Sequence, residues 1–153
     1  MDEGLQIPER AAFLRVRHGA TRESSALVRN FVGHADEVTG CTVTPDGQRV
    51  ISASNDQTLK VWDLDSGRLL ATFEGHADRV TACVVTPNGH RVVSASDDRT
   101  LKAWDLESGR PVATFEGHAS RVTACAVAPD GRRVVSASRD KTLKVWDFQR
   151  GCA

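Results

Sequence analysis

The chain has 153 residues, which is enough for one domain with a hydrophobic core. Its 20 Lys and Arg residues balance 20 Asp and Glu residues, so the near-zero net charge gives no long-range attraction to nucleic acid or to an anionic membrane. Residues 1–8 include two acidic residues and no apolar core, so they do not resemble a secretory signal. No run of the sequence approaches the ~18–20 apolar residues of a membrane span. We therefore expect a cytoplasmic protein that binds neither nucleic acid nor membrane.

The N-terminal residues 1–25 fall outside the pattern that governs the rest of the chain, and we expect a poorly ordered leader. Within it, residues 9–17 are compatible with two helical turns, and a small docking segment is the alternative interpretation. Residues 26–32 predict a strand, because they match the predicted strands 69–73 and 111–115 farther along the chain.

An internal repeat with a period of 42 residues begins at Gly33. Residues 33–74 and 75–116 are identical at 30 of 42 positions without gaps, and a third copy occupies residues 117–149. With the strand at 26–32, the copies form a repeat domain over residues 26–149, and residues 150–153 form a C-terminal tail.

Each copy alternates short β-branched and apolar segments with turn residues. In the second copy this pattern predicts strands over residues 79–86, 91–96, 100–104 and 111–115. The tight turns favour antiparallel neighbours, so each copy is expected to be a four-stranded meander. Sheets this short are expected to bury their faces against one another.

The Gly-His opening, the Ser-Ala-Ser-x-Asp segment and the Trp-Asp close, spaced by 42 residues, resemble the WD-repeat β-propeller family over residues 26–149. The resemblance implies an all-β fold with three four-stranded antiparallel WD-repeat blades, a partial propeller per chain. It implies a non-catalytic protein–protein interaction scaffold without a cofactor. The near-identity of the copies also resembles bacterial WD-repeat arrays. A sensor or regulatory fragment of a larger bacterial NTPase or kinase signalling protein is therefore the alternative.

In that family a His, a Ser or Thr, an Asp and a Trp form a hydrogen-bonded chain inside each blade. The matching positions here are His34, Ser52, Asp56, Trp62; His76, Ser94, Asp98, Trp104; and His118, Ser136, Asp140, Trp146. The chemistry is consistent, because a buried indole N–H needs an acceptor, which the Ser hydroxyl provides while it donates to imidazole. The Trp and the Ser share a face of the sheet if the hairpin loop between their strands has an odd number of residues.

Ser, His and Asp also suggest a hydrolase triad, so an enzyme with a rim or channel site is a further alternative. Against it, each Ser lies inside a predicted strand, and three copies of the set favour a structural role. The histidines of these sets occur one per copy, and no Cys or His lies nearby at the spacing of metal ligands. We therefore expect no catalytic residue and no metal site.

Two segments change chemical character between the copies, the one after Gly-His and the turn between the second and third strands. In the family both lie on one rim of the propeller, which binds partners. The rim positions are Asp36, Glu37, Asn55, Gln57, Asp78, Arg79, Asp97, Arg99, Ser120, Arg121, Arg139 and Lys141. They imply a protein-binding rim that runs from acidic to basic, with neutral drift of a solvated surface as the alternative.

Three of the four cysteines, Cys41, Cys83 and Cys125, occupy one repeated position. We interpret them as small buried apolar side chains in a reducing compartment, without disulfides among them. Cys152, near the C-terminus, is expected to be an exposed free thiol.

The repeat domain has a surplus strand at its start and ends before the fourth strand of its third copy. Propellers have ~4–8 blades, so we expect a head-to-tail homodimer with six blades. In it, residues 26–32 of each chain would pair with residues 142–146 of the other. Three chains with nine blades, or a truncated fragment that never closes, are the alternatives.

Overall fold

The structure, a computed structural model, describes residues 23–151 of the chain. It divides at Asn30 into two units, residues 1–30 and residues 31–153. In the first unit, Leu27 N donates a hydrogen bond of 3.0 Å to Ser24 O, which closes a turn. The helical turns predicted over residues 9–17, and Cys152, lie outside the described residues.

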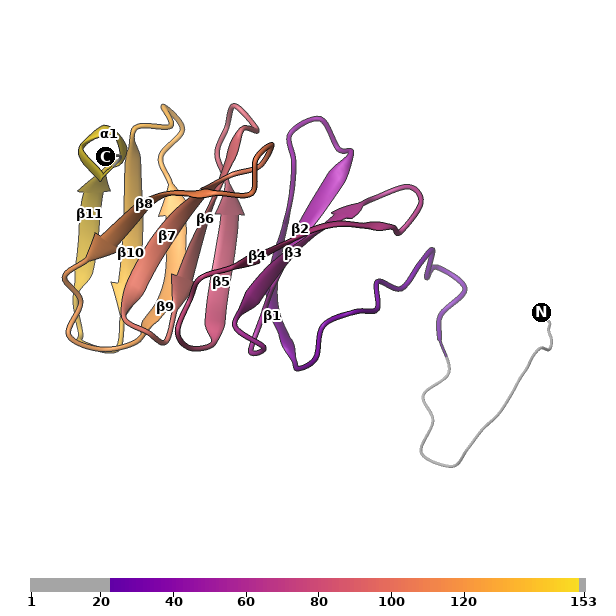
Figure 1. Ribbon diagram of the computed structural model, residues 1–153, viewed down its shortest axis with the longest axis horizontal. Helices are drawn as coiled ribbons and strands as arrows, with labels where there is room; N and C mark the ends of the chain where they lie inside the picture. Colours follow the sequence, from indigo (N-terminus) through magenta and orange to yellow (C-terminus); the bar gives the residue numbers. More distant parts are fainter. Residues whose placement is uncertain (1–22, 152–153) are drawn as a thin grey trace. The chain divides into compact units, whose positions relative to one another are not determined.

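The second unit consists of three antiparallel sheets that follow one another along the chain (Figure 1). The first sheet comprises β1 (Val38–Val43), β2 (Arg49–Ser54), β3 (Thr58–Asp63) and β4 (Leu69–Glu74). The second comprises β5 (Val80–Val85), β6 (Arg91–Ser96), β7 (Thr100–Asp105) and β8 (Pro111–Glu116). The third comprises β9 (Val122–Val127), β10 (Arg133–Ser138) and β11 (Leu143–Asp147), and the short helix α1 (Phe148–Gly151) follows it.

The all-β architecture predicted from the repeat is confirmed. The prediction took the fourth strand of the third blade from a second chain, so the single chain tests only the first three strands of the third copy. Its sheet has three strands among the described residues, in the order β11-β10-β9. After β11 the chain turns into α1, where Asp147 Oδ1 accepts hydrogen bonds from the N–H groups of Gln149 and Arg150, at 2.9 and 3.1 Å. Asp63 and Asp105 accept the equivalent bonds in the turns that follow β3 and β7. Phe148 of α1 is buried, which holds this turn against the sheet.

The strand predicted over residues 26–32 is not present in the single chain, where these residues are not paired in a sheet. The expected partner of this strand is residues 142–146 of a second chain, so the pairing of the two strands stays a prediction. Within residues 23–151, the one helical segment lacks the length and apolarity that crossing a bilayer requires.

Hairpin turns of two kinds set the register within each sheet. In the loop between β1 and β2, Gly47 adopts a φ of 73°. The equivalent Gly89 and Gly131 of the other sheets have φ values of 76° and 72°, and this left-handed conformation favours glycine. Between β2 and β3, the three-residue loop 55–57 pairs Ala53 with Leu59. This odd loop length puts alternate residues of β2 and β3 on the same face, as the sequence predicted.

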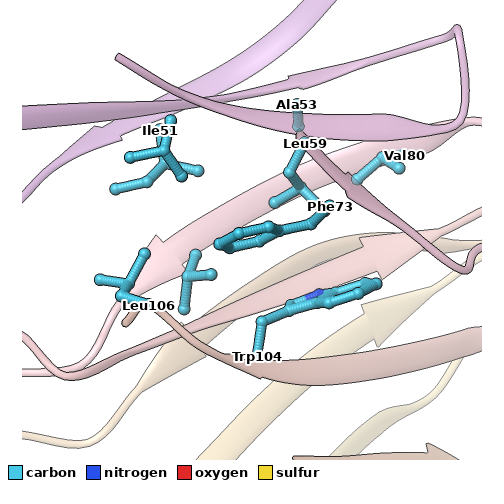
Figure 2. Close-up of a cluster of buried hydrophobic side chains, with 9 residues drawn as sticks. Ile51, Ala53, Leu59, Phe73, Val80, Trp104 and Leu106 are labelled. Carbon is cyan, nitrogen blue, oxygen red and sulfur yellow. The ribbon is translucent and has the colours of Figure 1, made fainter. Parts of the chain in front are cut away.

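Apolar side chains fill the space between successive sheets. We call the side of each sheet that faces the preceding sheet its front face, and the opposite side its back face. The back face of the first sheet contributes Ile51, Ala53, Leu59 and Val61, and the front face of the second contributes Val80, Val92, Trp104 and Leu106. Figure 2 shows the Phe73 ring lying over the Trp104 indole, with ring centroids 5.6 Å apart. The second and third sheets meet in the same way.

Candidate functional site

Each sheet contains a chain of hydrogen bonds that begins at a tryptophan indole. In the first sheet, Trp62 Nε1 donates to Ser52 Oγ at 2.8 Å, and Ser52 Oγ lies 2.6 Å from His34 Nε2. The other ring nitrogen, His34 Nδ1, lies 2.8 Å from Asp56 Oδ2. Because the indole donates, the Ser hydroxyl proton is available for Nε2, and the Nδ1 proton for the carboxylate. This chain of hydrogen bonds provides a partner for each of the four side chains in it.

The other two sheets bring together the equivalent side chains with nearly the same distances. The Trp–Ser, Ser–His and His–Asp distances are 2.8, 2.7 and 2.8 Å in the second sheet and 2.8, 2.7 and 2.7 Å in the third. The members of these chains are His76, Ser94, Asp98 and Trp104, and His118, Ser136, Asp140 and Trp146.

Local structure explains how four distant positions meet. Ser52 lies in β2 and Trp62 near the end of β3, where Val50 pairs with Trp62, so the Ser and the Trp are diagonal neighbours on one face. Asp56 lies in the hairpin loop between them. The Gly33-His34 segment crosses the indole edge, where a Cβ at Gly33 would lie 3.0 Å from Trp62 Cη2. The glycine of the Gly-His pair thus allows the histidine to reach the serine.

Sequence reasoning missed a further member of each chain, the threonine two residues after the aspartate. Thr58 Oγ1 donates to Asp56 Oδ1 at 2.6 Å, and its backbone N–H donates to the same oxygen at 3.0 Å. Thr100 and Thr142 repeat this arrangement with Asp98 and Asp140. The signal was present in the sequence as Asp-x-Thr in all three copies.

These contacts keep the Asp56 carboxyl ionised. Burial by itself would raise its pKa, but hydrogen bonds from Thr58 and His34 outweigh burial and hold the pKa well below its usual range. The backbone N–H of Ala35 donates a further bond of 3.0 Å to Asp56 Oδ2. In Asp98 burial is again opposed by His76 and Thr100, which lower the pKa; in Asp140 the bond from Thr142 is the largest cause of the lowered pKa.

The serines of these sets are not arranged as open nucleophiles. Ser52 is 7% exposed, and Ser94 and Ser136 are fully buried. Each hydroxyl is held between an indole and an imidazole, whereas a hydrolase serine needs one lone pair facing a substrate. The geometry therefore gives the sets a structural role, that of tying the Gly-His segment, β2, β3 and their loop together.

The two variable segments of each copy lie together at one edge of the sheets. Asn55 N donates to Glu37 O at 2.9 Å, and the equivalent bonds join Asp97 to Arg79 and Arg139 to Arg121. Of the rim positions, Asn55, Asp97 and Ser120 are half-buried and the others are exposed: Asp36, Glu37, Gln57, Asp78, Arg79, Arg99, Arg121, Arg139 and Lys141. Gln57, Arg99 and Lys141 have φ values of 73–76° without being glycine. Such a conformation is uncommon for these residue types and is held here by the loop.

One ion pair of the rim joins two sheets. Arg121 Nε lies 3.9 Å from Asp97 Oδ2, which connects the start of the third sheet to a loop of the second. Within the first sheet, Asn55 Nδ2 donates to Glu37 Oε1 at 3.4 Å. The rims of the second and third sheets are therefore in contact.

The repeated cysteines are free thiols, but their burial differs. Burial raises the pKa of the Cys125 thiol to about 12 and also raises the pKa of the Cys83 thiol. Cys41 is exposed, so its predicted burial is wrong. Cys83 and Cys125 face a preceding sheet. Cys41 lies on the front face of the first sheet, and no sheet precedes it among the described residues.

Comparison with known proteins gives the repeat a family. The sequence model for "WD domain, G-beta repeat" (WD40) matches residues 25–63, 67–105 and 109–147, which together make up more than half of the chain. Each match ends at the Trp-Asp pair of one copy.

Curated relatives match over about one repeat. The chain is 43% identical over 49 residues to the small ribosomal subunit protein RACK1 of Saccharomyces cerevisiae, which is 32% of this chain and 15% of that protein. It is 40% identical over 45 residues to the transcriptional repressor tup12 of Schizosaccharomyces pombe, 29% of this chain and 8% of the repressor. It is 48% identical over 45 residues to the vegetative incompatibility protein HET-E-1 of Podospora anserina, 29% of this chain and 3% of that protein. The matches thus cover a small part of each relative. With its three family matches and its three sheets of common architecture, the chain belongs to the WD40 repeat family.

Proposed function

We propose that this chain is a non-catalytic scaffold that binds other proteins through its rim, the twelve positions from Asp36 to Lys141 named above. The observation that carries the proposal is that the segments that change charge between copies lie together at one edge of a repeated framework. Framework residues are held by burial and hydrogen bonding, whereas rim loops are free to vary and carry binding residues. The proposal agrees with the general role of WD repeats in protein–protein interaction.

The charges of the rim favour a partner with a complementary charge order. The first sheet presents Asp36 and Glu37, and the third presents Arg121, Arg139 and Lys141. A partner surface that is basic at one end and acidic at the other fits this gradient. Such complementarity sets orientation and association rate more than affinity.

Quantitative affinity capture from cell lysate tests the rim. Reversing two exposed charges, Arg99→Glu with Lys141→Glu, is expected to remove the proteins that bind through the rim. Arg110→Glu with Arg132→Glu makes the same charge change on exposed residues at the opposite edge of the sheets and is the control. If wild type and both variants capture the same proteins in the same amounts, the variation of the rim is neutral drift and the proposal fails.

We also propose that the chain forms a head-to-tail homodimer with six blades. Two features support it: three sheets fall short of the ~4–8 blades of propellers, and β11 pairs on one side only among the described residues. We further propose a cytoplasmic location, which the free thiols of Cys41, Cys83 and Cys125 support because reducing compartments keep thiols free. A fluorescent fusion observed in cells tests the location.

A further inference from the structure

The two joints between sheets are copies of each other, and each joins the back face of one sheet to the front face of the next. At the first joint, Leu59 and Val61 meet Val80 and Val92. At the second, Leu101 and Ala103 meet Val122 and Val134, the residues 42 positions farther along. The chain therefore contains one kind of joint, used twice.

The two end faces of the stack expose the residues that this joint buries elsewhere. Val38, on the front face of the first sheet, is 55% exposed, whereas its counterparts Val80 and Val122 are fully buried. On the back face of the third sheet, Leu143 is 68% exposed, whereas Leu59 and Leu101 are fully buried. Each exposed end is thus one half of the joint, and the two halves are complementary.

A repeated hydrogen bond is also incomplete at the ends. Thr39 Oγ1 donates to Val80 O at 2.6 Å across the first joint, and Thr81 Oγ1 donates to Val122 O at 2.6 Å across the second. Within the described residues, Thr123 Oγ1 has only the bond to Ala137 O in its own sheet, at 3.3 Å. Val38 occupies the position of Val80 and Val122 in the repeat. The equivalent acceptor for Thr123 is therefore Val38 O of another copy.

Charge at the rim indicates which surface completes the joint. The Asp97–Arg121 ion pair crosses the second joint. The equivalent positions at the two exposed ends are Arg139 and Glu37, again of opposite sign but with acid and base exchanged. Neither side chain has an ion pair among residues 23–151. The charges of the ends match each other across a joint of the same geometry.

We infer that a second copy of this chain completes both ends, so that the back face of the third sheet packs on the front face of the first sheet of the other copy. Glu37 of one copy pairs with Arg139 of the other, and Thr123 donates to Val38 O. This joint, which rests on the proposed homodimer, occurs twice in a two-copy ring. A two-fold axis relates the two contacts, so each end of one copy meets the opposite end of the other. The reversed ion pair distinguishes this joint from the second internal joint, where Asp97 pairs with Arg121, and from the first, where Asn55 and Arg79 occupy these positions.

The test exchanges the charges for residues that the chain already carries at the same positions. Glu37→Arg introduces the residue found at Arg79 and Arg121, and Arg139→Asp introduces the residue found at Asp97. Each single change creates a like-charged contact and is expected to raise the dimer dissociation constant by about tenfold or more. The double variant recreates the Asp97–Arg121 pairing and is expected to restore the wild-type constant. Lys141→Asp, the same kind of change in the same loop, is the control.

Light scattering after size exclusion, over a dilution series of the full chain, measures these constants. The expected wild-type particle has twice the 16.6 kDa mass of one chain. A folded monomer at all concentrations would overturn both the homodimer and this joint. A dimer that no variant weakens, or one that the double variant does not restore, would overturn the joint while leaving the homodimer proposal standing.

Discussion

Trp104 Nε1 donates a hydrogen bond of 2.8 Å to Ser94 Oγ, and both residues are fully buried. The indole at the same time fills the joint between the first and second sheets, where Phe73 stacks on it. One side chain thus closes a polar network within its own sheet and packs the apolar contact with its neighbour.

We expect Trp104→Phe to lower the free energy of unfolding by roughly 2–4 kcal/mol, because it combines a cavity with a buried hydroxyl that has lost its donor. Urea denaturation of the variant and the wild type measures the loss. Trp146→Phe is the matched control, since Trp146 is only half-buried and its loss should be smaller. Equal losses for both variants would contradict a role for burial.

Acid is expected to destabilise the protein through the three aspartates of the hydrogen-bonded sets. Their pKa values are lowered in the folded state, so each contributes stability that is complete above the unfolded value of about 4 and is lost as pH falls toward the folded value. Melting temperatures between pH 7 and pH 3 measure this effect. The difference between wild type and Asp98→Asn should be largest near pH 7 and shrink below pH ~4. A difference that is constant over this range would show that Asp98 does not titrate in this way.

Thr100 is expected to matter through its contact with Asp98. Thr100→Val keeps the shape of the side chain but removes the 2.6 Å bond to a charged acceptor, which should lower the free energy of unfolding by about 1.5–3 kcal/mol. Thr114→Val removes an exposed bond of 3.1 Å from Lys102 and should change it by less than about 0.5 kcal/mol. Chemical denaturation of the two variants compares them directly. Similar losses would mean that Thr100 acts through packing alone.

The predicted exchange of residues 26–32 between copies has its own test. In the first sheet Leu59 pairs with Phe73, and the equivalent pair in the exchange is Leu143 with Phe31 of the second copy. Deletion of residues 1–32 is expected to weaken the dimer because it leaves β11 with an open edge. Deletion of residues 1–22 is the control and should leave the dimer intact, as judged by light scattering. A dimer that survives both deletions would exclude strand exchange.

The sequence predicted much of the fold because the 42-residue period repeats both the strands and their turns. The pattern of apolar residues predicted a strand over residues 91–96, which are the observed bounds of β6. The odd length of the hairpin loop predicted that Trp62 and Ser52 lie on one face of the sheet. The helix at Phe148–Gly151 was not foreseen, since the equivalent segments after β3 and β7, with the same aspartate hydrogen bonds, are turns. Thr58 was not predicted because it is not one of the four residue types of the family pattern, although Asp-x-Thr recurs in all three copies.

The sequence by itself determined which residues form each sheet and which side chains can meet inside it, because strand pairing and hairpin length are local properties. Only the tertiary structure decided which copy of a repeated residue is buried. Val38 and Val80 occupy the same position of the repeat, yet one is 55% exposed and the other fully buried. Burial is a property of the adjoining sheet, and a repeat does not state where its stack begins or ends. The same reason explains why the Arg121–Asp97 ion pair, which joins two sheets, was visible only in three dimensions.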